Sequence, residues 1–322
     1  METAIIIVNY KVPWHLDQCL KSVFKHTQNF HIFLVHNPGD EKSIAVGDKF
    51  KKKYPSQITI KINQENLGYV GGVNSAYQEA IKFERVCFLN PDSIVTRGWL
   101  QELNKVLDEK DEVVQVSPDS NQYYDESLLW RLVRWQVKKR WPLTGDKIYR
   151  YMLYFNPPHT KEDLEFRDTG DAFYLFCGGF CNVIKSKYFK DLGYFLDPKI
   201  VHGYGDDFDL SYYLRQFGKL GTVNKSYVFH FVNASLKRLK TDGDYLKEHV
   251  KFLNRMYLIA KWEVRIKADM NIIGQERLID LAQHHPEVKF MLEYYGLASV
   301  NPALKEYFKA APANEYREQF LK

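Results

Sequence analysis

The sequence predicts an α/β fold: a mostly parallel sheet flanked by helices, followed by a helical C-terminal region. Three observations predict it. Over the first hundred residues, short apolar runs alternate with helical patterns, which is typical of a parallel sheet covered by helices. The chain has 322 residues and is 45% hydrophobic, enough to build a sizeable core. Beyond residue 236 only helical periodicity continues.

The elements of the first half follow from the spacing of their apolar residues. Continuous apolar runs bounded by turn clusters predict strands, whereas apolar residues three and four apart predict helices. The predicted strands cover residues 5–8, 32–35, 58–62 and 86–89. The predicted helices cover residues 14–26, a polar basic stretch ending near residue 54, and residues 71–83.

The second half is less regular. Residues 117–170 are rich in loop signals, with one basic, tryptophan-bearing amphipathic helix predicted over residues 125–141. Such a helix can lie on a membrane surface or dock on its own domain, and docking is the commoner outcome. Further helices are predicted over residues 210–217, 245–262 and 275–283. We therefore treat residues 237–322 as a helical C-terminal region.

Composition narrows the classes of function. The net charge of +5 permits anionic ligands but does not indicate a nucleic-acid partner. The four cysteines lack the paired spacing of a zinc site, so we expect reduced thiols in a cytoplasmic protein. No apolar run approaches the roughly 20 residues that span a bilayer. Any membrane contact is expected to be peripheral, at the cytoplasmic face, and the oligomeric state has no sequence signal.

Carboxylates gather at two places far apart in the chain. Asp92 follows the predicted strand 86–89, and ligands of open α/β sheets bind outside the C-terminal ends of strands. Asp206, Asp207 and Asp209 precede a helical pattern. If the two groups converge, they can hold a divalent metal or accept a proton, and the spacing leaves both open. Asp209 is expected to cap the helix rather than to catalyse.

A glycine-rich turn lies between these two groups. Residues 66–74 follow the third predicted strand and open a helix. Glycines let the backbone approach a bulky ligand, and the N–H groups of a helix N-terminus attract phosphate.

In order and content these segments resemble the family 2 inverting glycosyltransferases, and most closely their rhamnosyltransferase-like branch. The matching segments are Ile6-Ile7-Val8-Asn9-Tyr10, Asn66-Leu67-Gly68 with Asn74, Phe88-Leu89-Asn90-Pro91-Asp92, Gly205-Asp206-Asp207-Phe208-Asp209-Leu210, and Val228-Phe229-His230 with Ser235. The resemblance covers residues 4–240 and implies the Rossmann-like GT-A fold. It makes residues 1–236 the catalytic domain, with a nucleotide-binding half (1–116) and an acceptor-binding half (117–236).

The resemblance also implies a role for each matching residue. Asp207 would be the catalytic base, and Asp206 would hold Asp207 or bind the acceptor. Two like charges this close would raise one pKa, which suits a base. Asp92 and His230 would bind Mn²⁺ or Mg²⁺ at the donor diphosphate. The residues expected around the nucleotide are Val8, Asn9, Tyr10, Asn37, Asn66, Gly68, Asn74, Asn90, Pro91 and Asp92.

The leading hypothesis is an inverting glycosyltransferase of polysaccharide biosynthesis. It would move a hexosyl or deoxyhexosyl group from a nucleotide-sugar donor to a glycan or lipid-linked glycan. A nucleotidyltransferase acting on a sugar phosphate is one alternative, but residues 9–14 lack the basic, glycine-rich phosphate loop it needs. A non-catalytic nucleotide-sugar-binding scaffold is the other, because Asn90 stands where the family has the first Asp of its Asp-x-Asp element. His36-Asn37 replaces an Asp that often contacts the base, so the base stays open.

Overall fold

One nine-stranded sheet forms the centre of the part of the chain described by this computed structural model. The structure describes residues 2–120, 166–170, 175–231, 243–284, 288–289 and 291–292. The strands are β1 (Thr3–Asn9), β2 (Phe30–His36), β3 (Ile58–Ile62), β4 (Arg85–Leu89), β5 (Ser93–Val95), β6 (Val113–Asp119), β7 (Phe166–Asp168), β8 (Cys181–Lys185) and β9 (Lys219–His230). Their order is β3-β2-β1-β4-β8-β6-β9-β5, and β7 pairs with β9.

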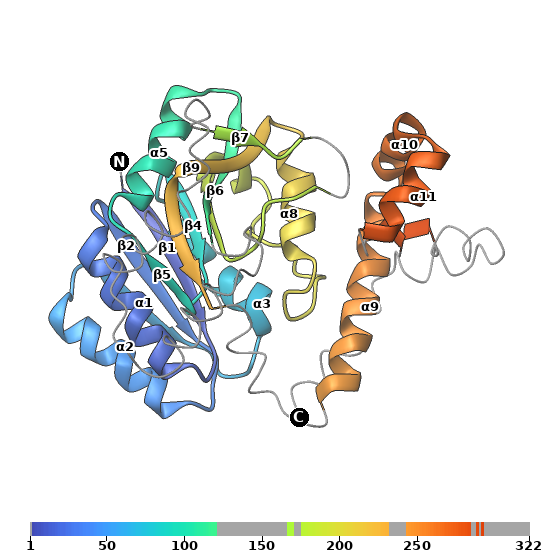
Figure 1. Cartoon of the computed structure of the whole chain (residues 1–322). Helices are drawn as coiled ribbons and strands as arrows, with labels where there is room; N and C mark the ends of the chain where they lie inside the picture. The colour runs from blue at the N-terminus through green and yellow to red at the C-terminus, as the bar shows by residue number, and fades with distance from the viewer. Residues whose placement is uncertain are drawn as a thin grey trace, which may run out of the picture.

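Helices flank this sheet. They are α1 (Pro13–His26), α2 (Glu41–Lys53), α3 (Gly68–Ser75), α4 (Tyr77–Ala80), α5 (Trp99–Glu109), the short 3₁₀ helix η1 (Ser186–Phe189), α8 (Asp206–Leu214), α9 (Gly243–Lys261), α10 (Glu263–Ile273) and α11 (Gln275–His284). Figure 1 shows α1 and α2 beside the parallel strands, α8 toward the opposite end of the sheet, and α9 to α11 beyond α8.

The first four strands are parallel, as the sequence predicts, and β1, β2 and β4 are buried on both faces, whereas the edge strand β3 is half-buried. In β1, Ile5 and Ile7 belong to the apolar cluster that contains Leu16 of α1. The alternate residue Ile6 belongs to the cluster on the other face, which contains Val73 of α3. Because both faces are covered, the strand reads as one continuous apolar run.

The second half of the sheet is mixed. β8 runs antiparallel to β4 and to β6. β9 pairs in parallel with β6 and then runs antiparallel to β5, with His230 opposite Ser93. The long strand β9 therefore carries His230 to the residue that follows Asp92, although 138 positions separate His230 from Asp92 in the chain.

An ion cluster with two buried carboxylates docks α9 and the start of α10 onto α8 and the loop before it. The Lys261 ammonium lies 2.7 Å from an Asp197 oxygen and 2.7 Å from an Asp209 oxygen. The Trp262 indole N–H donates to Asp209 (2.7 Å), and the Tyr257 hydroxyl donates to Asp197 (2.6 Å). Both carboxylates are buried, so these four contacts replace the water that the charges have lost.

Charge sharing explains the opposite pKa shifts in this cluster. Burial lowers the pKa of Lys261, but Asp209 and Asp197 outweigh it and raise that pKa. Burial raises the pKa of Asp197, yet Lys261, Tyr257 and a backbone N–H outweigh it and lower the net value. Asp209 is more deeply buried, and its pKa stays raised despite Lys261 and Trp262. Lys261 thus pairs with two carboxylates, and the effect of burial on the pKa is offset more fully at Asp197 than at Asp209.

Most predicted elements are confirmed, with two corrections. The helix predicted over residues 71–83 begins earlier, at Gly68, and breaks into α3 and α4. The N-cap expected at Asp209 is wrong: the cap of α8 is Gly205, whose φ of +90° favours glycine, and Asp209 lies inside the helix. The segment 125–141 lies outside the described residues. Across the described ranges, every helix is too short or too polar to cross a bilayer.

We expect Lys261→Met to destabilise the protein by about 3–5 kcal/mol, because it leaves two buried carboxylates without their shared cation. Chemical denaturation monitored by tryptophan fluorescence measures this loss. Lys267→Met is the matched control, because Lys267 is exposed and its ion pair with Glu263 spans one helical turn of α10. That control should cost about 0–1 kcal/mol. Equal losses in the two variants would show that the cluster does not hold α9 in place.

Candidate functional site

Several of the sequence-predicted residues lie where β1, β2 and β4 end. Asn9 closes β1, Asn37 follows β2, and Asn90 follows β4. Because these strands are parallel and adjacent, their C-terminal ends bring polar side chains together, as expected for open α/β sheets. Asn9 donates from its amide to a ring nitrogen of His36 (3.3 Å) and is fully buried.

Asp92 and His230 meet directly. The His230 Nε2 atom lies 3.0 Å from an Asp92 oxygen and 3.4 Å from the Asn90 amide nitrogen. Both Asp92 and His230 are buried, and the His230 ring stacks on Phe180 with 5.1 Å between ring centroids. The structure therefore pairs the two residues that the sequence proposes as metal ligands.

The glycine-rich turn is held by its own polar side chains. The Asn66 side-chain oxygen accepts from the Gly68 N–H (3.0 Å), and the Asn37 amide donates to the Gly68 carbonyl (3.0 Å). Gly68 has a φ of +66°, and a Cβ there would lie 2.5 Å from the His202 Cα. Only glycine permits this approach between the turn and residue 202.

The other predicted nucleotide-site residues are placed differently. The Asn74 oxygen accepts from the backbone N–H groups of Phe195 and Leu196 (3.0 Å each), and its amide donates to the Leu196 carbonyl (2.7 Å). These contacts make Asn74 a clamp between α3 and residues 195–196. Val8 and Pro91 are buried, whereas Tyr10 is half-buried beside the Lys11 ammonium. Their contact with a nucleotide stays a prediction.

The two adjacent carboxylates at the start of α8 occupy different environments. Asp206 is 6% exposed. Burial, and then the charge of Asp207, raise the pKa of the Asp206 carboxyl well above its ordinary value. Asp207 is half-buried, and its Oδ1 accepts from the N–H of Phe208 (2.9 Å). The sequence predicts one raised pKa in this pair, and the pKa of Asp206 is raised.

Tyr69 is a site residue that the sequence analysis does not identify. Burial, and then the charges of Asp206 and Asp207, raise the pKa of its hydroxyl well above the ordinary value. Its phenol therefore stays protonated near both carboxylates. The backbone N–H of Tyr69 donates to the His202 carbonyl (3.1 Å), which ties the glycine-rich turn to the loop before α8. Its one sequence signal is its position directly after Gly68.

Gly179 and Phe180 connect the two carboxylate groups. A Cβ at Gly179 would lie 3.3 Å from the Asp207 Cβ. The next residue, Phe180, stacks on His230, and its carbonyl accepts from the Asn90 N–H (2.8 Å). Asp207 and the Asp92–His230 pair therefore flank the same two residues.

The Asp92–His230 pair suits a divalent cation that keeps most of its other ligands. Among the residues the structure describes, no three or more His, Cys, Asp and Glu side chains form a metal-binding group. One carboxylate and one imidazole are sufficient for Mg²⁺ or Mn²⁺ where waters and substrate phosphates complete the coordination. An imidazole ligand suits a transition metal better than Mg²⁺.

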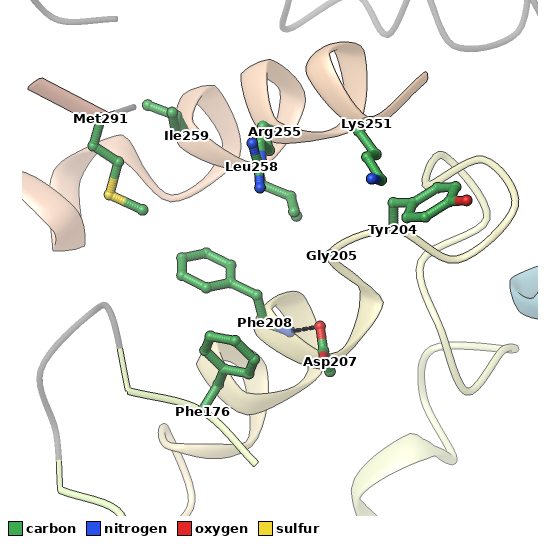
Figure 2. Close-up of a pocket in the computed structure, with 10 residues that line it drawn as sticks. All are labelled: Phe176, Tyr204, Gly205, Asp207, Phe208, Lys251, Arg255, Leu258, Ile259 and Met291. Atoms are coloured by element: carbon green, nitrogen blue, oxygen red, sulfur yellow. Dashed lines mark hydrogen bonds between the residues drawn. The ribbon is translucent and has the colours of Figure 1, made fainter. Parts of the chain in front are cut away.

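Asp207 also lines a pocket of about 240 Å³. Its walls come from the segment before β8, from α8 and from α9, as Figure 2 shows. The lining residues are Phe176, Tyr204, Gly205, Asp207, Phe208, Lys251, Arg255, Leu258, Ile259 and Met291. The sequence analysis did not identify Lys251 and Arg255. The feature that could have indicated them is their four-residue spacing, which places both on one face of a predicted helix.

Comparisons with known proteins agree with this geometry. The family model described as "Glycosyltransferase like family 2" matches residues 2–241. A 112-residue stretch is 27% identical to the minor teichoic acid biosynthesis protein GgaB of Bacillus subtilis (strain 168), covering 33% of this chain and 12% of GgaB. The chain thus spans only a small part of that relative's length.

Two solved structures share the fold. The crystal structure of GalNAc-T7 with UDP, GalNAc and Mn²⁺ superposes with a TM-score of 0.59 at 17% identity, over 94% of this chain and 58% of that one. The mannosyltransferase PcManGT from Pyrobaculum calidifontis, in complex with GDP-Man and Mn²⁺, gives 0.55 at 12% identity, over 100% and 88%. At these identities the likeness establishes the GT-A fold alone, which confirms the predicted fold class.

We expect Asp206→Asn to change how stability depends on pH. A carboxyl whose pKa is raised on folding stabilises the protein at low pH, and this stability is lost as pH rises through the folded pKa. The thermal midpoint of the wild type minus that of Asp206→Asn should therefore fall as pH rises above about 4, the ordinary carboxyl pKa.

Asp197→Asn provides a control of opposite sign, because the pKa of Asp197 is lowered on folding. Its stabilising contribution is present above the ordinary carboxyl pKa and is lost as pH falls, so the corresponding difference should grow with pH. A pH-independent difference for Asp206→Asn would contradict the raised pKa.

Proposed function

The chain belongs to glycosyltransferase family 2, and from this premise we propose that it moves one sugar from a nucleoside-diphosphate donor to a hydroxyl of a glycan or lipid-linked glycan, inverting the anomeric centre. The observation that carries the proposal is the position of Asp207. This half-buried carboxylate lines the pocket beside α9, and it packs against Gly179, next to the Phe180 ring that stacks on His230.

Each side of Asp207 then has a task. The donor diphosphate lies toward Asp92 and His230, and the acceptor enters the pocket. Asp207 takes the proton of the acceptor hydroxyl, whose oxygen bonds to the anomeric carbon. The bond from that carbon to the diphosphate oxygen breaks, and the leaving nucleoside diphosphate keeps the electron pair. Attack from the face opposite the leaving group inverts the centre.

The neighbouring carboxylate and phenol tune this base. Burial favours the protonated form of Asp206 by raising its pKa, and in that form Asp206 can donate a hydrogen bond that holds the loop beside Asp207 in place. The nearby Tyr69 hydroxyl keeps its own proton. We infer that Tyr69 orients the carboxylates by hydrogen bonding and takes no part as a base.

Asp92 and His230 would hold Mn²⁺ or Mg²⁺ beside the diphosphate. A bound divalent ion neutralises the negative charge that develops on the leaving group. The Mn²⁺ in the GalNAc-T7 and PcManGT structures supports this assignment. Asn90, 3.4 Å from His230, orients the imidazole in place of the second carboxylate that the family often has.

The name of GgaB supports a place in cell-surface polymer biosynthesis. We propose that the transferred group is a hexosyl or deoxyhexosyl unit and that the reaction occurs at the cytoplasmic face of the membrane. We also propose that residues 1–116 form a nucleotide-binding half and residues 117–236 an acceptor-binding half. The helical C-terminal region then begins at residue 237.

Asp207→Asn should lower the transfer rate by about 10²–10⁴-fold, the usual contribution of a general base. Nucleoside-diphosphate binding, followed by thermal shift, should stay within experimental error of the wild type. Asp191→Asn is the matched control, because Asp191 is exposed and outside the site. Undiminished turnover in Asp207→Asn would reject this residue as the base. Binding without turnover in the wild type, over a broad acceptor panel, would favour the scaffold alternative.

Asp92→Asn should weaken the metal-dependent part of nucleotide binding. We expect the Mn²⁺ concentration that gives half of the UDP- or GDP-induced thermal shift to rise at least about tenfold, equivalent to about 1.4 kcal/mol. Chelation with EDTA should remove the difference between variant and wild type. An unchanged Mn²⁺ requirement would place the ion elsewhere.

A further inference from the structure

The pocket beside Asp207 combines cations with apolar and aromatic walls. Lys251 and Arg255 lie one turn apart on α9, so both face the pocket from the same side of the helix. Apolar side chains line the remaining wall: Phe176, Phe208, Leu258, Ile259 and Met291. Among the lining residues that the structure describes, Asp207 is the one carboxylate.

The buried side-chain amide of Asn254 fixes the position of α9, and with it Lys251 and Arg255, relative to the segment before Asp207. The Asn254 side chain accepts from the Val201 N–H (3.1 Å) and donates to the carbonyls of Val201 (2.8 Å) and Tyr204 (3.0 Å). The chain continues from Tyr204 through Gly205 to the acidic pair at the start of α8. The Lys251 ammonium lies 5.3 Å from the centre of the Tyr204 ring. Since Asn254 lies between Lys251 and Arg255 in sequence, its three bonds fix where α9 presents them.

The charge pattern sets the orientation of a ligand in this pocket. Arginine and lysine are the side chains that bind phosphate groups, whereas a carboxylate repels them. An anionic group therefore lies toward α9, and an uncharged hydroxyl lies toward Asp207. The apolar and aromatic side chains offer surfaces for the faces of a sugar or polyol. A volume of about 240 Å³ is below the roughly 300–1,000 Å³ of drug-sized ligands, which suits one monomer unit.

Building on the proposed function, we propose that this pocket is the acceptor subsite and that the acceptor carries a phosphate group, bound by Lys251 and Arg255, next to the hydroxyl that is glycosylated. The C-terminal helical region thereby selects the acceptor, while the sheet edge holds the donor. The phosphate can belong to a phosphodiester polymer or to a lipid-linked sugar diphosphate, because both present the same anionic chemistry to α9.

Binding of defined probes to the full chain tests this assignment, in the presence of Mn²⁺ and UDP or GDP. The probes are a short glycerol-phosphate oligomer, a sugar diphosphate on a short lipid, and a neutral oligosaccharide of similar length. We expect at least one phosphate-bearing probe to bind at least about tenfold more tightly than the neutral one, a difference of about 1.4 kcal/mol. The tighter of the first two identifies the source of the phosphate.

The decisive comparison is between two double variants with the same charge change. Lys251→Gln/Arg255→Gln should lose at least about tenfold in affinity for the phosphate-bearing probe, with nucleotide affinity unchanged. Lys267→Gln/Arg277→Gln removes two exposed cations of α10 and α11 outside the pocket and should bind as the wild type does. If the first variant folds poorly, Arg255→Gln alone repeats the test, because Arg255 is exposed.

Equal affinity of both double variants, or equal binding of neutral and phosphate-bearing probes, overturns the subsite. These readouts are independent of turnover. Loss of transfer in every assay, with phosphate-selective binding retained, would reject the proposed function and leave the subsite standing. Normal transfer to a neutral acceptor, without selective binding of the phosphate-bearing probes, would reject the subsite and leave the proposed function standing.

Discussion

The structure depends on one lysine that is shared by two buried carboxylates. Lys261, at the end of α9, contacts Asp197 in the loop before α8 and Asp209 within α8. Burying two carboxylates without a cation costs free energy. Movement of α9 away from α8 would remove Lys261 from both carboxylates, so it is unfavourable. Asp209 lies two residues from Asp207, and Lys261 is on the same helix as Lys251 and Arg255. The cluster therefore fixes the distance between the proposed base and the cations of α9.

Three aspartates lie within four residues, and each has a different role because its surroundings differ. Asp206 is buried beside a like charge and its pKa is raised. Asp207 is half-buried and lines a pocket. Asp209 is buried but bonded to Lys261 and Trp262. In active sites, acid and base roles are assigned to neighbouring carboxylates by surroundings that give them different pKa values.

The site also depends on close packing between segments that are distant in sequence. Gly68 approaches the backbone of residue 202, and Gly179 lies against Asp207. Tyr69 then stands near Asp206 and Asp207. A side chain at Gly68 would clash with the backbone of residue 202, and one at Gly179 would press on the Cβ of Asp207. The glycines are thus required by proximity as much as by backbone conformation.

The sequence by itself determined strands β1 to β4 and the helices between them, because apolar periodicity is local information. It also identified Asp92 and Asp207 as candidates, because each follows or precedes a recognisable element, and the family resemblance added His230. Only the tertiary structure decided their partners. The pairing of Asp92 with His230 depends on strand β9 reaching β5, and the helix cap expected at Asp209 became an anchor for α9. Tyr69, Lys251 and Arg255 escaped sequence reasoning because burial, nearby charge and shared pockets arise from contacts between segments far apart in the chain.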